Sequence, residues 1–259
     1  MPDSIVTFED VDVVYRLQGG GETVACQGLG FAVRENEFVS IVGPSGCGKS
    51  TSLRVIAGLQ PYRRGSVRVR REPVGHRVPD GLAMMFQTPV LLDWNSVIDN
   101  VGLPLEVAGL SRREARAESR RFLELAQLER FADARPYELS GGMQQRVALC
   151  RALVSKPDLL LMDEPFGALD ALTRAQMGGV LQNIWERQKV AVVFVTHSIR
   201  EAVTLSDRVL VMSARPGRLL KDVRIDLPRP REGAVRRMAK FQDYVDEIAV
   251  CLGMPDGVE

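Results

Sequence analysis

The chain has 259 residues, 45% of them hydrophobic, and a formal net charge of +1 at pH 7. This length accommodates one large α/β domain with an insertion or two small domains, and the small charge excludes a strong overall attraction to nucleic acid or acidic lipid. No apolar run approaches the ~20 residues of a membrane-spanning helix, and we see no secretion signal. The four scattered cysteines form no CxxC pair, so we expect neither a zinc site nor disulfides, and a reducing, intracellular compartment.

The N-terminal third predicts mostly extended structure. We expect short strands at residues 5–8, 11–15 and 28–33, and a hairpin-type break at glycines 19–21. Residues 63–77 are dense in arginine and alternate with apolar residues, which predicts a half-exposed strand with a solvated basic face. Because no aromatic residues are interleaved with these arginines, this segment is not favoured as a nucleic-acid site.

Residues 43–51, GPSGCGKST, fit the phosphate-loop pattern of Gly, four free positions and Gly-Lys-Ser/Thr. An apolar, β-branched run precedes the pattern and a helix-compatible run follows it, which disfavours an ordinary tight glycine turn. Backbone N–H groups and the positive end of a helix would surround a polyphosphate there. Lys49 would reach the β- and γ-phosphates, and the Ser50 hydroxyl would ligate Mg²⁺. The predicted nucleoside triphosphate site comprises Gly43, Pro44, Ser45, Gly46, Cys47, Gly48, Lys49, Ser50 and Thr51.

Two side chains near this loop have more than one interpretation. Tyr15 lies 28 positions before Gly43 and either stacks on an adenine ring or packs within its strand. Cys47 stands two residues before Lys49 at a predicted helix N-terminus, which favours the thiolate. We therefore expect a reactive Cys47 thiol that bound nucleotide protects.

The middle of the chain predicts a helical insertion. A buried strand at 82–86 ends in Gln87, and the carboxyl edge of a parallel strand is where ligands bind in open α/β sheets. A helical stretch follows over about 97–127, interrupted at Leu103-Pro104-Leu105, with a capping box at residues 111–114.

The second half predicts further polar groups at helix starts and strand ends. Ser140, Gly141 and Gly142 precede a helix and form either a second anion site or an ordinary N-cap with loop glycines. An apolar strand ends in Asp163, which suits Mg²⁺, and Glu164, which can polarise an attacking water. A later strand carries His197 to the same edge, where a packed core histidine is the alternative. We find no physical account of Gly178-Gly179 inside a predicted helix, and we expect a final helix of about twenty residues.

In this order and with these spacings, the motifs of residues 6–212 resemble the ATP-binding cassette ATPases of membrane transporters. The resemblance implies an α/β fold: a P-loop NTPase core with a mostly parallel sheet, an N-terminal antiparallel β subdomain and a helical insertion. It implies that residues 1–87 and 157–226 form the ATP-binding core, 88–156 the helical subdomain with the signature motif, and 227–259 a short helical tail. ATP and Mg²⁺ are the implied cofactors.

The resemblance also assigns roles to individual residues. Tyr15 stacks on adenine, Gln87 joins Ser50 and Asp163 around Mg²⁺ and senses the membrane partner, and Glu164 is the general base. His197 holds the γ-phosphate. Ser140, Gly141 and Gly142, with Asp170, act on the ATP held by a second copy of the chain.

Finer features resemble the nitrate, sulfonate and taurine branch of importers, notably the segments at residues 91–94, 100–106, 172–174, 214–218 and 225–230. This implies a homodimeric motor on the cytoplasmic face of the membrane, bound to permease subunits and served indirectly by an external solute-binding protein, with no nucleic acid partner. Importers of vitamin precursors share the branch. A soluble cassette ATPase acting on ribosomes or DNA is the alternative class, disfavoured by the single cassette and by the absence of sustained heptads.

Overall fold

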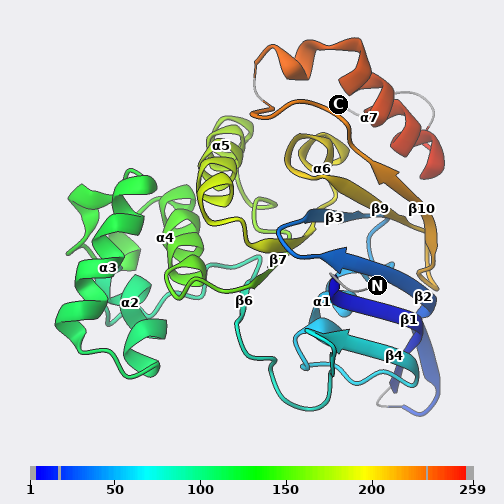
Figure 1. The fold of residues 1–259 in the computed structure, drawn as a ribbon, viewed down its shortest axis with the longest axis horizontal. Helices are drawn as coiled ribbons and strands as arrows, with labels where there is room; N and C mark the ends of the chain where they lie inside the picture. Colours follow the sequence, from blue (N-terminus) through cyan, green and yellow to red (C-terminus); the bar gives the residue numbers. More distant parts are fainter. Residues whose placement is uncertain (1–3, 17–18, 232, 255–259) are drawn as a thin grey trace. The chain divides into compact units, whose positions relative to one another are not determined.

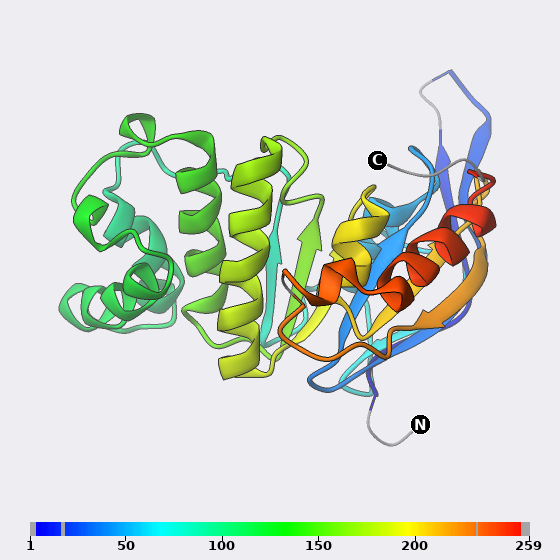
Figure 2. The ribbon, with the colours of Figure 1, turned by 90° about the horizontal axis from the view of Figure 1, so that it is seen from above.

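The structure, a computed structural model, describes residues 4–16, 19–231 and 233–254. It comprises two compact units, one formed by Met1–Leu82 with Ala191–Glu259 and the other by residues 83–190 (Figures 1 and 2). Among the described residues, no helix combines the length and apolar character needed to cross a bilayer. The predicted three-part division into core, helical subdomain and tail is not tested by these units and stays a prediction.

The first unit contains an antiparallel sheet in the order β2-β1-β4-β5. Its strands are β1 (Ser4–Arg16), β2 (Glu22–Arg34), β4 (Arg64–Val69) and β5 (Glu72–Pro73). The two strands expected at 5–8 and 11–15 are one continuous strand. The register shifts between Phe8 and Val11, and Asp10 there has a positive φ of 52°. An irregularity of this kind absorbs the break in alternation without ending the strand.

The second sheet of this unit positions the phosphate loop. Strand β3 (Phe38–Val42) pairs in parallel with β8 (Ala191–Val195) and with β9 (Arg208–Met212), and β10 (Leu219–Arg224) pairs antiparallel with β9. Every residue of β3 and β8 is buried, as expected for parallel strands covered on both faces. Helix α1 (Lys49–Ile56) follows β3 after the loop.

The C-terminal segment belongs to the core of this unit. Helices α6 (Ile199–Leu205) and α7 (Ala239–Cys251) pack together (Figure 1), and Phe241, Val245 and Ile248 of α7 join one buried cluster with residues of β9 and β10. The final helix is 13 residues long, preceded by the 3₁₀ turn Val235–Arg237, and so is shorter than the expected twenty.

A buried guanidinium fixes the start of this C-terminal segment. Arg231 donates hydrogen bonds to the carbonyl oxygens of Val203 (2.9 Å), Ile225 (3.1 Å), Leu227 (3.3 Å) and Ser206. Burial lowers the pKa of Arg231 to about 10, below its usual value, so the cation remains charged at neutral pH. Since Val203 and Ser206 lie at the end of α6, the positive charge also stabilises the C-terminus of that helix.

The second unit is mainly helical. It contains β6 (Leu82–Met85) except its first residue, the neighbouring β7 (Leu159–Asp163), α2 (Val97–Val107), α3 (Arg112–Leu125), α4 (Gly141–Leu153), α5 (Ala171–Gln188), and 3₁₀ turns at Glu129–Phe131 and Pro136–Glu138. The expected break at residues 103–105 is wrong, because Pro104 lies inside α2 and the chain leaves the helix at Ala108. The capping box of Ser111 and Glu114 is confirmed.

Asp99 of α2 links this helix to α3. Its carboxylate is 6% exposed and accepts hydrogen bonds from Arg116 Nε (2.7 Å), Arg112 Nη2 (2.7 Å) and Ser96 Oγ (2.7 Å). The bond from Arg116, followed by those from Arg112 and Ser96, holds the pKa of Asp99 well below its usual range. The ionised form therefore stabilises the fold at neutral pH.

We expect Asp99→Asn to lower the free energy of unfolding by about 1–3 kcal/mol at pH 7. This loss is smaller than for a fully buried ion pair because both arginines are partly exposed. A depressed pKa contributes stability above the unfolded value of ~3.9 and loses it as the pH falls through the folded value. The difference between wild type and variant should therefore shrink from about pH 4 downwards in urea titrations. Asp133→Asn is the control, since Asp133 is 84% exposed and 3.8 Å from Arg116. A difference that stays constant to pH 3 would contradict this assignment.

Candidate functional site

Close packing of glycines shapes the phosphate loop between β3 and α1. Gly48 is the N-cap of α1 with φ 101°, and a Cβ atom there would lie 2.4 Å from Cys26 Sγ. A Cβ atom at Gly43 would lie 2.8 Å from Met212 O. Lys49 Nζ donates to Gly43 O (2.9 Å) and Pro44 O (3.1 Å), so the ammonium group lies over the loop. The result is a glycine cradle at a helix N-terminus with a cation beside it, which suits a phosphate group.

Two further predicted residues of the first unit lie beside the loop. Tyr15 OH and Thr51 Oγ1 are 3.1 Å apart, which holds the tyrosine ring at the first turn of α1. His197 is exposed two residues after β8, and Val195 of β8 pairs in parallel with Ile41 of β3. Because parallel strands end at the same edge, His197 emerges beside the strand that leads into the phosphate loop. The structure thus brings Tyr15, the loop and His197 together.

The expectation of a reactive Cys47 thiol is wrong. The Cys47 side chain is 1% exposed, and its sulfur would lie 2.9 Å from a Cβ atom at Gly43. The tight turn of the loop directs this thiol inward, away from the solvent-facing Ser45 and Gly46. Cys26 is buried beneath the same loop, and desolvation raises the pKa of its thiol to about 11.

We therefore expect maleimide to modify one cysteine of the native protein. Of the four cysteines, Cys26, Cys47 and Cys150 are buried and only Cys251 is partly exposed. Mass spectrometry should find the adduct on Cys251, and Cys251→Ala should abolish fast labelling while wild-type ATPase activity survives the reagent. Modification of Cys47 that ATP prevents would contradict the buried placement.

In the second unit, three predicted residues follow the neighbouring strands β6 and β7. Gln87 is exposed two residues after β6, and Asp163 is the buried last residue of β7. Glu164 has a positive φ of 45°, and its carbonyl oxygen accepts from Gly167 N at 3.1 Å. A left-handed backbone is unfavourable for glutamate by ~1 kcal/mol or more, and such strain concentrates at functional sites.

The signature residues and Asp170 cap two adjacent helices of the same unit, α4 and α5 (Figure 2). Ser140 Oγ accepts from Met143 N (3.4 Å), and both Ser140 and Gly141 are exposed. Asp170 accepts from Thr173 Oγ1 (2.6 Å) and from its N–H (3.0 Å), and these bonds lower the pKa of Asp170. A Cβ atom at Gly142 would lie 2.4 Å from the Thr173 methyl carbon. Gly142 and Thr173 thus bring the two helix starts together.

Helix α4 also carries two functional candidates that the sequence did not reveal. Gln145 Nε2 donates to Gln87 O (2.7 Å), and Arg151 donates to Pro89 O (2.7 Å) and Val90 O (2.8 Å). Arg151 interrupts an otherwise apolar stretch of the helix, and this charge was the sign in the sequence that could have pointed to its role. The helix that begins at the signature motif therefore holds the backbone of the segment that follows Gln87.

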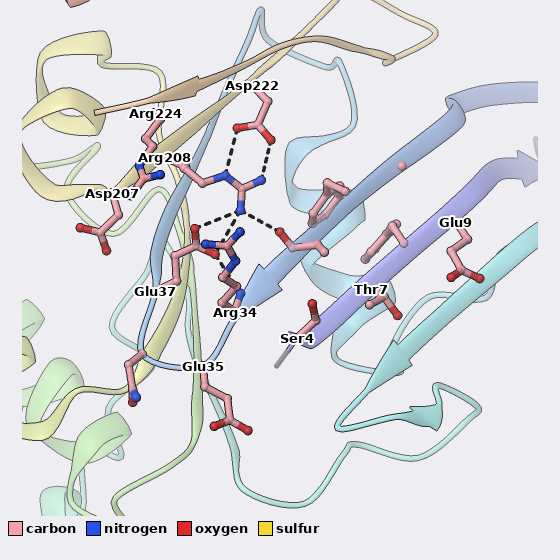
Figure 3. A pocket seen from close by; sticks show the side chains of 15 residues that line it. Ser4, Thr7, Glu9, Arg34, Glu35, Glu37, Asp207, Arg208, Asp222 and Arg224 are labelled. Atoms are coloured by element: carbon pink, nitrogen blue, oxygen red, sulfur yellow. Dashed lines mark hydrogen bonds and ion pairs between the residues drawn. The ribbon is translucent and has the colours of Figure 1, made fainter. Parts of the chain in front are cut away.

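A cavity of about 820 Å³ elsewhere in the first unit is lined by charged groups that pair with one another (Figure 3). Arg208 donates to Asp222 Oδ1 (3.0 Å), to Glu37 Oε1 (3.0 Å) and to Ala32 O (3.0 Å). Bonding to Asp222 and then to Glu37 raises the pKa of Arg208 above its usual value. We assign this cavity no ligand. No three His, Cys, Asp or Glu residues in the described parts of the chain form a cluster able to hold a metal.

Comparison with known proteins identifies the family. The family described as ABC transporter matches residues 26–167. The taurine import ATP-binding protein TauB of Rhizobium johnstonii is 50% identical over 92% of this chain and 88% of its own length. The bicarbonate transport ATP-binding protein CmpC of Synechocystis is 43% identical over 88% of this chain and 34% of its own length.

A solved structure confirms the predicted fold class. An ATP-binding cassette, described as a dimer in a post-hydrolysis state bound to ADP and Pi, superposes with a TM-score of 0.74 and 32% identity. The match covers 85% of this chain and 99% of that cassette. The chain therefore belongs to the ABC transporter family and is one of its ATP-binding, ATP-hydrolysing proteins.

Proposed function

We propose that the chain is the motor subunit of an importer of a small solute with an oxyanion group, such as nitrate, a sulfonate or taurine, and works as a pair of identical subunits. The observation that carries the pairing is the exposed N-terminus of α4, where Ser140 and Gly141 face solvent. A helix N-terminus attracts anions. Because the first unit already provides a phosphate loop, this second helix end suits the ATP of another copy. Gly142 and Asp170 would support it from the same side.

The other predicted residues then have roles at the ATP of their own chain. Tyr15 stacks on adenine, Lys49 and the loop N–H groups bind the β- and γ-phosphates, and His197 orients the γ-phosphate. Glu164 accepts the proton of the attacking water. Ser50, Gln87 and Asp163 would supply oxygen ligands to Mg²⁺, a hard cation that would neutralise phosphate charge when bound.

Glu164→Gln tests the shared site, because it keeps the side-chain shape and removes the base. The variant should bind ATP without hydrolysing it, and the trapped nucleotides should hold two chains together. Size exclusion with ATP and Mg²⁺ should then show a dimer for the variant and not for the double variant Glu164→Gln/Lys49→Ala, which lacks the phosphate-binding lysine. A variant that binds ATP but remains monomeric at saturating concentration would refute the shared site.

The second partner that we propose is a membrane permease, contacted through the segment after Gln87. Trp94 is 74% exposed, Val90 is also exposed, and Leu91 and Leu92 are partly so. These apolar side chains fit a groove for a short helix of the permease. The bonds from Gln145 and Arg151 to residues 87–90 would pass movements of α4 to this segment.

The resulting placement is peripheral, on the cytoplasmic face of the membrane. Relatives named for taurine and for bicarbonate transport support a small solute with an oxyanion group. An external solute-binding protein would deliver that solute.

Trp94→Ala should weaken permease binding by ~2 kcal/mol or more, about thirtyfold, while basal ATPase activity stays within about twofold. Co-purification with a co-expressed candidate permease and an ATPase assay of the isolated subunit measure the two effects. Val107→Ala is a matched control, since Val107 on α2 is an apolar side chain 81% exposed. Equal loss of basal activity in Trp94→Ala would show that Trp94 supports the fold rather than the interface.

A further inference from the structure

The loop between β9 and β10 has a rigid internal structure. Ser213 Oγ accepts from Arg218 N (2.9 Å) and donates to Pro216 O (3.0 Å), while Ser213 N donates to Arg218 O (2.9 Å). The loop is also attached to β2: Gly217 N donates to Ala25 O (2.9 Å), and Gln27 N donates to Gly217 O (3.0 Å). Residues 213–218 therefore form a fixed platform rather than a free connection.

This platform lies directly against the phosphate loop. A Cβ atom at Gly217 would be 1.9 Å from Cys47 O, so only glycine fits there. Arg215 Nε donates to Gly46 O at 3.2 Å. Arg215 is exposed, and its two terminal nitrogens make no hydrogen bond or ion pair with the described residues. The platform thus holds one charged donor at the outer face of the loop.

The bond to Gly46 O has a consequence on the other side of the same peptide group. In a trans peptide the C=O and the following N–H point in opposite directions. With Gly46 O held by Arg215, Cys47 N on the opposite side of the peptide donates a long hydrogen bond to Pro44 O (3.3 Å). Because this bond is long, an anion in the loop can take the same N–H instead, and the guanidinium adds positive potential close to it.

We propose that Arg215 is a positioning residue for nucleotide binding, which acts through Gly46 to hold the Gly46–Cys47 peptide in its anion-binding orientation. Its partner is the phosphate loop of its own chain, so the effect requires neither a second copy nor a permease. It should therefore appear with ADP, which occupies the loop without hydrolysis. The role belongs to the guanidinium, because Nε supplies the bond and the charge is fixed.

Titration calorimetry with Mg-ADP tests this role in the nucleotide-free full-length protein. Arg215→Ala should raise the Kd for ADP about three- to tenfold at low salt, the range expected for one ordinary hydrogen bond at an exposed site. Part of the effect should disappear at about 0.5 M salt, because an exposed charge is screened. Arg215→Lys, which keeps the charge and loses the planar donor, should fall between wild type and Arg215→Ala.

Arg218→Ala is the matched control, because Arg218 stands on the same loop, is exposed and bonds Gln27 instead of the phosphate loop. It should leave the Kd for ADP within twofold of wild type, and the nucleotide-free Tm of Arg215→Ala should match that of wild type. If Arg215→Ala fails to fold, Arg215→Gln replaces it at similar length without charge. An unchanged Kd for ADP, or an equal rise in Arg218→Ala, would overturn the proposal.

Discussion

The shape of the phosphate loop depends on contacts that leave no space for a side chain. Its N–H groups must be available to an anion, and the one bond that Cys47 N donates within the loop, to Pro44 O, is long at 3.3 Å, so hydrogen bonds of the loop itself hold its shape only weakly. Packing of glycines fixes the shape instead: Gly48 rests on Cys26, and Gly217 rests on Cys47 O. A Cβ atom at either glycine would displace the loop, and the anion-binding groups would move with it. Tyr15, Lys49 and His197 are useful only around a loop of constant shape.

Helix α4 is a rigid element that connects two surfaces of the second unit. Its N-terminus carries the exposed signature residues, and its Gln145 and Arg151 hold three carbonyl groups of residues 87–90. Because these bonds go to the backbone, the segment follows the helix whatever side chains it displays. An ATP-dependent shift of α4 would therefore move Gln87 and the apolar residues after it as one body.

The sequence predicted those local structures that patterns of a few residues encode. The phosphate loop, the strand-end carboxylates and the capping box depend on spacing within a few residues, and the β-branched runs marked the buried strands. Features that depend on distant segments were missed or wrong. Arg215 and Gly46 are 169 positions apart, so no local pattern links them. The reactivity of Cys47 was predicted wrongly, because the turn of the loop, rather than the position of the residue before Lys49, decides where its thiol points. Pro104 stays within α2 although proline usually ends a helix.

Strand β3 has consequences for synthesis of the protein, because both of its sheet neighbours come from residues after Val190. While a ribosome makes residues 83–190, the apolar edges of β3 lack β8 and β9, and unpaired edges invite association with other chains. The second unit is continuous in sequence and can collapse as soon as it leaves the ribosome. The nucleotide-binding unit can therefore complete its fold only late in translation, and β3 must be kept from associating with other chains until β8 and β9 have been made.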